Sequence, residues 1–331
     1  MKAWATTTRT MKRRSTSLRL APQQLGNFES LDIIVGNDDD DDDDGTVARR
    51  IVRLERYVSS SRQQPVLIPY HQGWKRQQEL WQRHANSTDT TIHHVDNDKS
   101  TTTITTTKTT TGNSSSSSSS TNACHNDVIM MLQHEPIYTL GTGSDESFIR
   151  SNSNNDNDAI PVQRINRGGE VTYHGPGQLT VYPVLDLRHY RQDVHWYVRA
   201  LEEVVIKALQ SLGIADAARE ADTTGVWVRG HKVAAIGVHA RRWITQHGFA
   251  INVTPESLSA FGGIVPCGLH GRQVGCVQQF IDDQNSGTTT NDTNNANNNN
   301  KNTKQITVEE VADAVAMAFE KVFCVKLETE Q

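Results

Sequence analysis

The chain has 331 residues and a formal net charge of −5. Seven consecutive aspartates at 38–44 contribute seven negative charges, which is more than this net value. The rest of the sequence is therefore nearly neutral and indicates neither an acidic nor a basic partner. No stripe of basic and aromatic residues suggests nucleic-acid binding, and no apolar run approaches the ~20 residues of a membrane-spanning helix. The composition thus excludes nucleic-acid-binding and membrane-spanning proteins and favours a soluble protein.

The N-terminal part contains a basic segment followed by an acidic one. Residues 1–28 hold six Lys and Arg residues, many Ser and Thr residues and no Asp or Glu. This composition is typical of an organelle transit peptide, whereas a basic start without any role is the alternative. We expect a transit peptide at 1–28 and a disordered acidic linker at 29–65. The expected compartment is the mitochondrion, with the plastid as the alternative.

Low-complexity segments interrupt the remaining sequence. The Thr/Ser, Asn/Asp and Asn-rich runs predict inserts at 86–123, 151–158 and 285–304, because they lack the apolar side chains that would offset the entropy of ordering. Without the inserts and the N-terminal segments, roughly 200 residues remain, which suits one domain with a proper core. We therefore predict a single folded domain at 66–328.

The first half of this domain predicts one helix and two strands. In "VLIPYHQGWKRQQELWQRHAN", the residues Tyr70, Trp74, Gln77 and Trp81 share one helical face. The apolar run 128–132 predicts a buried strand that ends before a proline. A second strand is expected in "QLTVYPVLDL".

The second half predicts helices at both ends and strands between them. "DVHWYVRALEEVVIKALQSLG" predicts a helix capped by Asp193, with Gly213 after its end. The runs 226–228 and 233–238 predict a hairpin, and "GFAINV" predicts a further strand. A Thr307/Glu310 capping box begins the helix expected to close the chain. Strands and helices without regular βαβ alternation favour an α+β fold.

Two residues are candidates for chemistry. Cys267, in "GGIVPCGLHG", would be nucleophilic only with a lowered pKa, and a lone cysteine is more often a small buried hydrophobic residue. Lys232 could supply the positive neighbour, since an ammonium ~4 Å away at an effective dielectric of ~20 favours the thiolate by up to ~4 kcal/mol. A surface lysine is the commoner case. His174 is a rival partner of Cys267 that the residues alone do not exclude.

Metal and phosphate motifs are absent from the sequence. The four cysteines show no CxxC spacing, and the histidines form no HExxH motif, so no metal is expected. The glycine-rich stretch "RINRGGEVTYHGPGQLTVYP" matches neither GxxxxGK[ST] nor GxGxxG. Its glycines would instead permit turns and a close approach of backbone to a ligand.

Several blocks together resemble a known family. "RGGEVTYHGPGQLTVYPVLDL", "GVWVRGHKVAAIGVHARRWITQHGFAINV" and "FGGIVPCGL", in this order and spacing, resemble the lipoyl(octanoyl) transferases, the LipB family. "YHQGWKRQQEL" and "LQHEPIYTLG" are similar to its opening helix and first strand. The inserts are not part of the family pattern, but they fall between the blocks. The fold implied is that of the biotin/lipoate protein ligases, α+β with a mixed central sheet.

The resemblance implies an acyltransferase with roles for particular residues. Cys267 would become an acyl-thioester, and Lys232 would lower its pKa and relay protons. His174 would position the substrate without acting as the base. The substrate would contact three segments: Arg167, Gly168, Gly169, Glu170, Val171, Thr172, Tyr173 and His174, then Ala235, Ile236 and Gly237, then Gly248, Phe249 and Ala250. Backbone N–H groups there would stabilise the oxyanion.

The resemblance also implies the partners. The donor would be octanoyl-acyl carrier protein, and the acceptors would be lysines in the lipoyl domains of 2-oxoacid dehydrogenase E2 subunits and in the glycine cleavage H protein. No cofactor is implied, and we expect a monomer in which Cys276 is structural. Two alternatives stay open: an ATP-dependent lipoate or biotin ligase, and a cysteine-dependent acyl hydrolase.

Overall fold

A computed structural model of the chain describes residues 49–58, 65–87, 126–150, 159–221, 223–264, 273–286 and 305–329. The expected transit peptide and the low-complexity runs lie outside these residues, apart from a few positions at their edges. Cys267 also lies outside them. In the described part, no helix is both long and apolar enough to cross a membrane.

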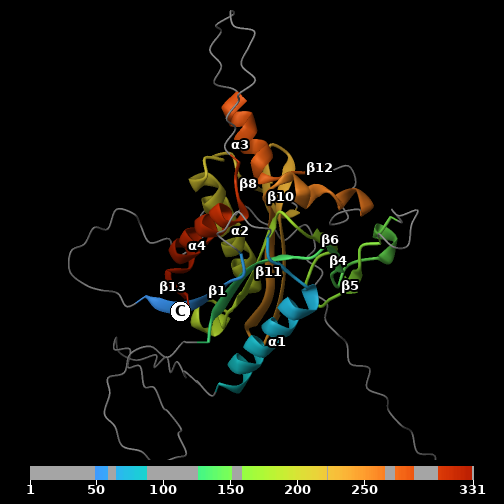
Figure 1. The fold of residues 1–331 in the computed structure, drawn as a ribbon. Coiled ribbons are helices and arrows are strands. Elements are labelled where there is room, and N and C mark those ends of the chain that lie inside the picture. Colours follow the sequence, from blue (N-terminus) through green and yellow to red (C-terminus); the bar gives the residue numbers. More distant parts are fainter. Residues whose placement is uncertain are drawn as a thin grey trace, which may run out of the picture. The chain divides into compact units, whose positions relative to one another are not determined.

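The described residues form a large mixed sheet, a small sheet and four α-helices (Figure 1). The strands are β1 (Arg50–Arg56), β2 (Leu67–Ile68), β3 (Val128–His134), β4 (Ile137–Leu140), β5 (Val162–Arg164), β6 (Val171–His174), β7 (Gln178–Val184), β8 (Ala218–Glu220), β9 (Thr223–Val228), β10 (His231–Arg241), β11 (Ile244–Asn252), β12 (Gln273–Val274) and β13 (Val325–Thr329). The helices are α1 (Tyr70–Asn86), α2 (Val194–Ser211), α3 (Val277–Ser286) and α4 (Val308–Phe323).

The large sheet mixes parallel and antiparallel pairs. Its strands follow the order β13-β1-β3-β7-β11-β10-β9-β8, with β2 beside β3 and β12 beside β10. The pairs β13-β1 and β1-β3 are parallel, whereas those from β3 to β8 are antiparallel. The predicted α+β fold with a mixed central sheet is therefore confirmed.

Helices cover both faces of this sheet, and the alternation along β7 shows how. Leu179 and Val181 point into the large core with α2 and α4, while Thr180 and Tyr182 point to the opposite face, where α1 packs (Figure 1). Successive side chains of a strand point to opposite faces, so one strand serves both layers. The face towards α1 is thus partly polar at the centre of the sheet.

The small sheet, of strand order β5-β4-β6, closes this face on one side. Val171 and Tyr173 of β6 are buried in a separate core with Phe261. Thr172 and His174, which alternate with them, point into the space between the two sheets. The "TYH" block therefore contributes one wall of a cavity and one part of a core.

The helix boundaries follow their capping residues. The Asp193 side chain accepts hydrogen bonds from the backbone N–H groups of His195 and Trp196, and Gly213 after α2 has a φ of 97°. At α4, Thr307 and Glu310 form the predicted capping box. Both helices and the β9-β10 hairpin are confirmed as predicted, although the hairpin strands are longer.

The buried face of α1 differs in part from the prediction. Tyr70 and Gln77 are buried as expected, but Trp74 and Trp81 are only half-buried. Gly73, Leu80 and His84 occupy the buried positions instead, and their spacing of three or four residues along the chain places them on one helical face with Gln77. The tryptophan rings rest at the edges of the contact, where Trp74 stacks on His247 with 4.8 Å between ring centroids.

Three elements correct the expected boundaries. Strand β1 lies between β13 and β3 in the sheet, so residues 50–56 are not part of a disordered linker. Strand β13 follows α4, so the helix does not close the chain. Helix α3 was not predicted, and it extends into the start of the expected insert at 285–304.

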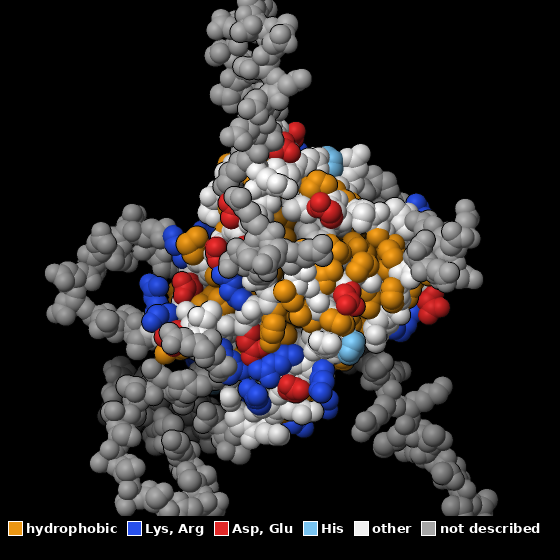
Figure 2. Space-filling view, in the orientation of Figure 1, with side chains coloured by type: hydrophobic (Ala, Val, Ile, Leu, Met, Phe, Trp, Pro, Cys, Tyr) orange, Lys and Arg blue, Asp and Glu red, His pale blue; other side chains and the backbone are white. Residues whose placement is uncertain are grey.

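The surface of this part of the molecule is uneven in character. Figure 2 shows hydrophobic side chains gathered across the visible face, with Lys and Arg side chains gathered below them in the region of α1. Lys75 and Arg83 on α1 are exposed. Helix α1 thus presents basic residues to solvent while its other side packs on the sheet.

Candidate functional site

A cavity of about 290 Å³ lies on the α1 face of the large sheet, beside the small sheet. Its walls come from β6 and the loop before it, from β7, and from the neighbouring strands β9, β10 and β11, with Tyr70 from the start of α1. This volume is near the lower end of the range for small-molecule sites. A slender ligand would suit it better than a bulky one.

The three sequence segments expected to contact substrate meet around this cavity. Eleven of their residues line it together with Lys232: Arg167, Gly169, Glu170, Thr172, His174, Ala235, Ile236, Gly237, Gly248, Phe249 and Ala250. The cavity is not lined by Gly168, Val171 or Tyr173. The side chains of Val171 and Tyr173 point into the small core instead, because successive side chains of β6 alternate between its two faces. That the lining residues bind substrate stays a prediction.

Sequence reasoning missed seven lining residues: Tyr70, Ile165, Thr180, Tyr182, Thr223, Thr224 and His247. The signal for two of them was present in "LTVYP", where Thr180 and Tyr182 alternate with apolar residues on one strand. The others come from α1, the loop after β5, β9 and β11, and no periodic pattern in the sequence distinguishes them.

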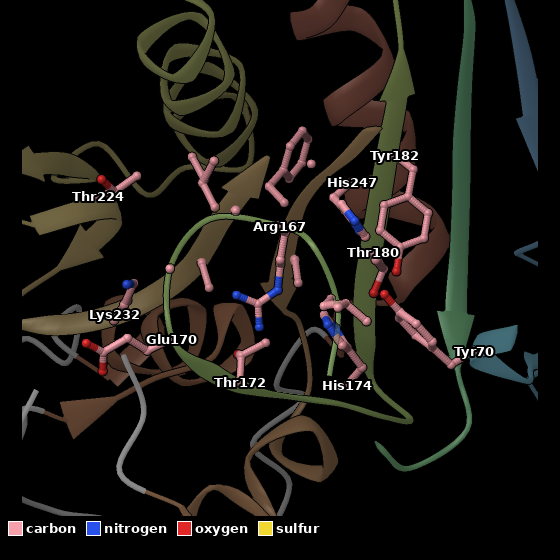
Figure 3. A pocket seen from close by; sticks show the side chains of 18 of the residues that line it. Tyr70, Arg167, Glu170, Thr172, His174, Thr180, Tyr182, Thr224, Lys232 and His247 are labelled. Carbon is pink, nitrogen blue, oxygen red and sulfur yellow. The ribbon is translucent and has the colours of Figure 1, made fainter. Parts of the chain in front are cut away.

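Lys232 occupies one side of the cavity (Figure 3). It is only 7% exposed, and its ammonium lies 5.7 Å from the centre of the Trp227 ring. Gly225 makes room for it: a Cβ at this glycine would lie 2.7 Å from Lys232 Cε and 2.5 Å from the Ala234 carbonyl oxygen. Gly225 also has a φ of 129°, which other residues rarely adopt.

Arg167 lies at the centre of the cavity in Figure 3. Its Nη2 donates to the carbonyl and hydroxyl oxygens of Thr139, both at 2.9 Å, and its Nη1 donates to the Gly168 carbonyl at 3.0 Å. Gly237 leaves space for the side chain, since a Cβ there would lie 2.9 Å from Arg167 Cδ. A buried guanidinium held this firmly places a fixed positive charge in the cavity.

The opposite side of the cavity is polar and begins with a fixed pair. His134 Nδ1 lies 2.7 Å from the Ile68 carbonyl, which can only accept, so Nδ1 carries the proton. The Tyr182 hydroxyl therefore donates to His134 Nε2, at 2.8 Å. Burial lowers the pKa of His134 to about 4, which keeps the ring neutral at pH 7. The Tyr182 hydroxyl can therefore only accept hydrogen bonds from any further partner.

A chain of hydrogen bonds fixes the tautomer of His174. Asn252 donates to the Gly275 carbonyl at 3.1 Å, and its own oxygen accepts from Gln178 Nε2 at 3.0 Å. The Gln178 amide oxygen is therefore the atom 2.8 Å from His174 Nδ1, which must donate to it. Burial holds the pKa of His174 well below its usual value, so Nε2 remains an acceptor.

Four lining residues have a buried polar atom without a hydrogen-bond partner among the described residues. They are Tyr70 Oη, Thr180 Oγ1, Thr223 Oγ1 and Glu170 Oε2. Buried polar atoms are nearly always paired with protein or water, so this concentration in one cavity indicates a place for a ligand or ordered water. In Figure 3, Glu170 lies on the side of Lys232, and Tyr70 and Thr180 lie on the opposite side.

The remaining histidine of the cavity is held between two elements. The backbone N–H of His247 donates to Gln77 Oε1 of α1 at 2.7 Å, and its Nε2 lies 2.9 Å from Asn166 Oδ1. Burial, followed by the charge of Arg167, lowers the pKa of His247 to about 3. The backbone of His247 thus joins β11 to α1, and its neutral ring joins β11 to the loop before β6 and closes this part of the cavity.

The second thiol near the expected nucleophile is buried. Cys276 is 1% exposed, and burial raises the pKa of its thiol, so it stays protonated at pH 7. This environment agrees with the structural role expected for Cys276. Within the described ranges, no group of three or more His, Cys, Asp and Glu side chains is placed to hold a metal ion.

Strand β12, which follows the segment that contains Cys267, lies beside Lys232. After residue 272 the chain resumes as β12, which pairs in parallel with β10 so that Val274 lies opposite Lys232. The Gly275 N–H donates to the Lys232 carbonyl at 3.1 Å. The pairing fixes only where the chain after Cys267 joins the sheet, because Cys267 itself lies outside the described residues.

The chain belongs to the family described as the Lipoyl protein ligase A/B catalytic domain, whose profile matches residues 116–320. The match covers the three cavity segments, Lys232 and Cys267. The resemblance recognised in the sequence is thereby confirmed.

Curated relatives of this chain are octanoyltransferases. One from Gloeobacter violaceus is 46% identical over 202 residues, which are 61% of this chain and 78% of the relative. The octanoyltransferase LIP2p2, chloroplastic, of Arabidopsis thaliana is 49% identical over 158 residues, 48% of this chain and 55% of the relative.

Among solved structures, a bipartite lipoate protein ligase from Thermoplasma acidophilum, studied with its E2 lipoyl domain, has a similar fold. The TM-score is 0.50 at 14% identity, over 86% of this chain and 88% of that one. The expected ligase-like fold is confirmed by this similarity, which carries nothing about activity.

Proposed function

We propose that this protein is an octanoyltransferase that places octanoyl groups from octanoyl-acyl carrier protein onto a lysine of lipoyl domains. The observation that carries the proposal is the convergence of three distant segments and Lys232 on one narrow cavity, in a chain 46% identical to an octanoyltransferase. The small volume of this cavity suits a thin alkyl chain, while the missing side chains of Gly237 and Gly248 leave room for Arg167 and for β7.

The proposed reaction has two steps. The Cys267 thiolate attacks the carbonyl of the donor thioester, and the carrier thiolate leaves and takes up a proton from the Lys232 ammonium, which becomes a neutral amine. The acceptor amine then attacks the acyl-cysteine, an amide forms, and Cys267 is released as a thiolate while the proton of the amine passes to Lys232 or solvent. Exchange between thioesters is nearly isoenergetic and amide formation is downhill, so no ATP is required.

The cavity offers groups for each part of the substrate. Lys232 would stabilise the Cys267 thiolate, and backbone N–H groups near the carbonyl would stabilise the oxyanion. The alkyl chain would run between β10 and β11 on one wall and the β6 segment on the other, past the fixed side chain of Arg167. His174, neutral and held by Gln178, would position substrate rather than act as the base.

One reconstituted reaction separates this function from its two alternatives. Octanoyl-acyl carrier protein and a lipoyl domain are incubated with the enzyme, with and without ATP, and the intact mass of the lipoyl domain is measured. We expect one octanoyl group on the domain, formed equally without ATP. Strict dependence on ATP would identify a ligase instead, and free octanoate with an unmodified domain would identify a hydrolase.

We further propose that the protein acts in an organelle. The basic composition of residues 1–28 supports import, and the similarity to a chloroplastic octanoyltransferase of Arabidopsis supports the plastid alternative over the mitochondrion. A fluorescent protein fused behind residues 1–48 is expected to enter the plastid in a plant or algal cell. Fluorescence confined to mitochondria would favour the other organelle, and cytosolic fluorescence would remove the targeting role.

A further inference from the structure

The side of the cavity opposite Lys232 carries hydroxyl groups that nothing in the described protein satisfies. Tyr70 is 5% exposed and Thr180 is 1% exposed, and neither hydroxyl has a hydrogen-bond partner among the described residues. Both line the cavity, one from the start of α1 and one from the middle of β7. Each can donate one hydrogen bond and accept others.

Two fixed acceptors lie beside these hydroxyls. The Tyr70 ring stacks on His174, with 6.3 Å between centroids, and His174 Nε2 is an acceptor. Tyr182 gives its proton to His134 and keeps its oxygen lone pairs. We call these four residues, Tyr70, Thr180, His174 and Tyr182, the polar end of the cavity; Figure 3 shows them together, across Arg167 from Lys232.

We propose that the polar end limits the length of the acyl chain that the enzyme transfers. This inference rests on the proposed function, which places the thioester carbonyl on the side of Lys232 and the methyl end of the chain towards the polar end. A chain that stops short leaves the cavity beside the hydroxyls open, and a small shift of either side chain then lets water reach its oxygen, which is closed off in the structure itself.

A longer chain changes this balance. Its additional methylene groups fill this space and exclude water, so that neither Tyr70 Oη nor Thr180 Oγ1 can gain a water partner. Leaving a buried hydroxyl without a partner lowers the affinity for the longer chain on the order of tenfold for each hydroxyl. The polar end therefore makes binding of a longer acyl chain less favourable, whereas an apolar end would make binding more favourable with each added methylene.

The inference predicts a response to removal of the two hydroxyls. The single variants Tyr70→Phe and Thr180→Val and the double variant are compared with the wild type for kcat/KM with octanoyl and decanoyl donors. We expect the ratio of decanoyl to octanoyl transfer to rise by about tenfold in each single variant and further in the double variant. Since neither hydroxyl has a partner in the described residues, these changes remove no hydrogen bond within that part of the protein, and the Tm of the variants should not fall.

Tyr138→Phe is the matched control. Tyr138 also belongs to a strand beside the cavity, but its hydroxyl donates to the Ala260 carbonyl at 2.7 Å and it does not line the cavity. Its removal should lower Tm and leave the decanoyl to octanoyl ratio unchanged. An equal rise of the ratio in this variant would overturn the inference, as would an unchanged ratio in the Tyr70→Phe/Thr180→Val double variant.

A pair of donors tests the wild type directly. The 8-hydroxyoctanoyl and nonanoyl chains have the same number of heavy atoms and differ only in a terminal hydroxyl or methyl group. We expect the wild type to prefer the hydroxyl chain, which can bond to the polar end, and the double variant to prefer nonanoyl. A wild type that prefers nonanoyl refutes the inference while octanoyl transfer still supports the function; a wild type that transfers no octanoyl refutes the function itself.

Discussion

Cys267→Ala is expected to abolish both the acyl-enzyme and the transfer of octanoyl to a lipoyl domain. Without its nucleophile the enzyme keeps only binding and oxyanion stabilisation, so kcat should fall by about 10³-fold or more. In the wild type, intact mass after incubation with octanoyl-acyl carrier protein should show one octanoyl adduct. The adduct should map to Cys267 by peptide mass and disappear when a lipoyl domain is added.

Cys276→Ala is the control for this prediction. Cys276 is buried, and burial raises the pKa of its thiol, so its removal should cost some stability but leave the adduct and its chase intact. Full transfer activity in Cys267→Ala, or a folded wild type that acquires no adduct, would contradict the covalent mechanism. An adduct lost from the Cys276 variant as well would move the nucleophile to the other thiol.

The strongly patterned parts of the fold could be predicted from the sequence. Helices α2 and α4 begin at Asp193 and Thr307 because local capping and an apolar face agree in both. Strand β1 escaped prediction although Val52 and Leu54 alternate with polar residues, because four of its seven residues are charged and it follows the aspartate run. Its place depends on β3 and β13, which come from distant parts of the chain.

The sequence allowed many residues of the site to be named, but it did not show how their side chains are arranged around the cavity. The family resemblance named segments, and the alternation of β6 decided which of their side chains face the cavity. The polar end combines Tyr70 from α1 with Thr180 from β7, which no spacing in the sequence relates. The need for glycine at position 225 depends on a neighbour across the hairpin, Lys232, and so required the structure.

Lys232→Ala is expected to slow formation of the acyl-enzyme at neutral pH. A normal thiol with a pKa near ~8.5 is only a few per cent ionised at pH 7, whereas a thiol whose pKa is lowered by two units is mostly ionised, so loss of Lys232 should slow acylation by about 30-fold. Raising the pH ionises the thiol without help from Lys232. Acylation in the variant should therefore recover partly towards pH ~9, as measured by rapid quench and intact mass.

Gly225→Ala is expected to produce much of the same defect without touching the ammonium itself. The added Cβ would lie 2.7 Å from Lys232 Cε and 2.5 Å from the Ala234 carbonyl, so Lys232 must move. Because the variant acts through Lys232, its effect on acylation should be far from additive with Lys232→Ala in the double variant. Tm is measured on each protein, since the backbone at φ 129° is also strained by alanine.

Gly230→Ala separates displacement of Lys232 from backbone strain. Gly230 lies in the turn of the same hairpin and also has a positive φ, 78°, but a Cβ there would meet nothing within 4 Å. We expect it to lose stability of about 1 kcal/mol and to acylate at the rate of the wild type. If Gly230→Ala slows acylation as much as Gly225→Ala, strain in the hairpin explains the defect.

The pH dependence of Lys232→Ala tests the role of the lysine itself. If the acylation rate of this variant does not rise with pH, Lys232 does not control ionisation of the thiol.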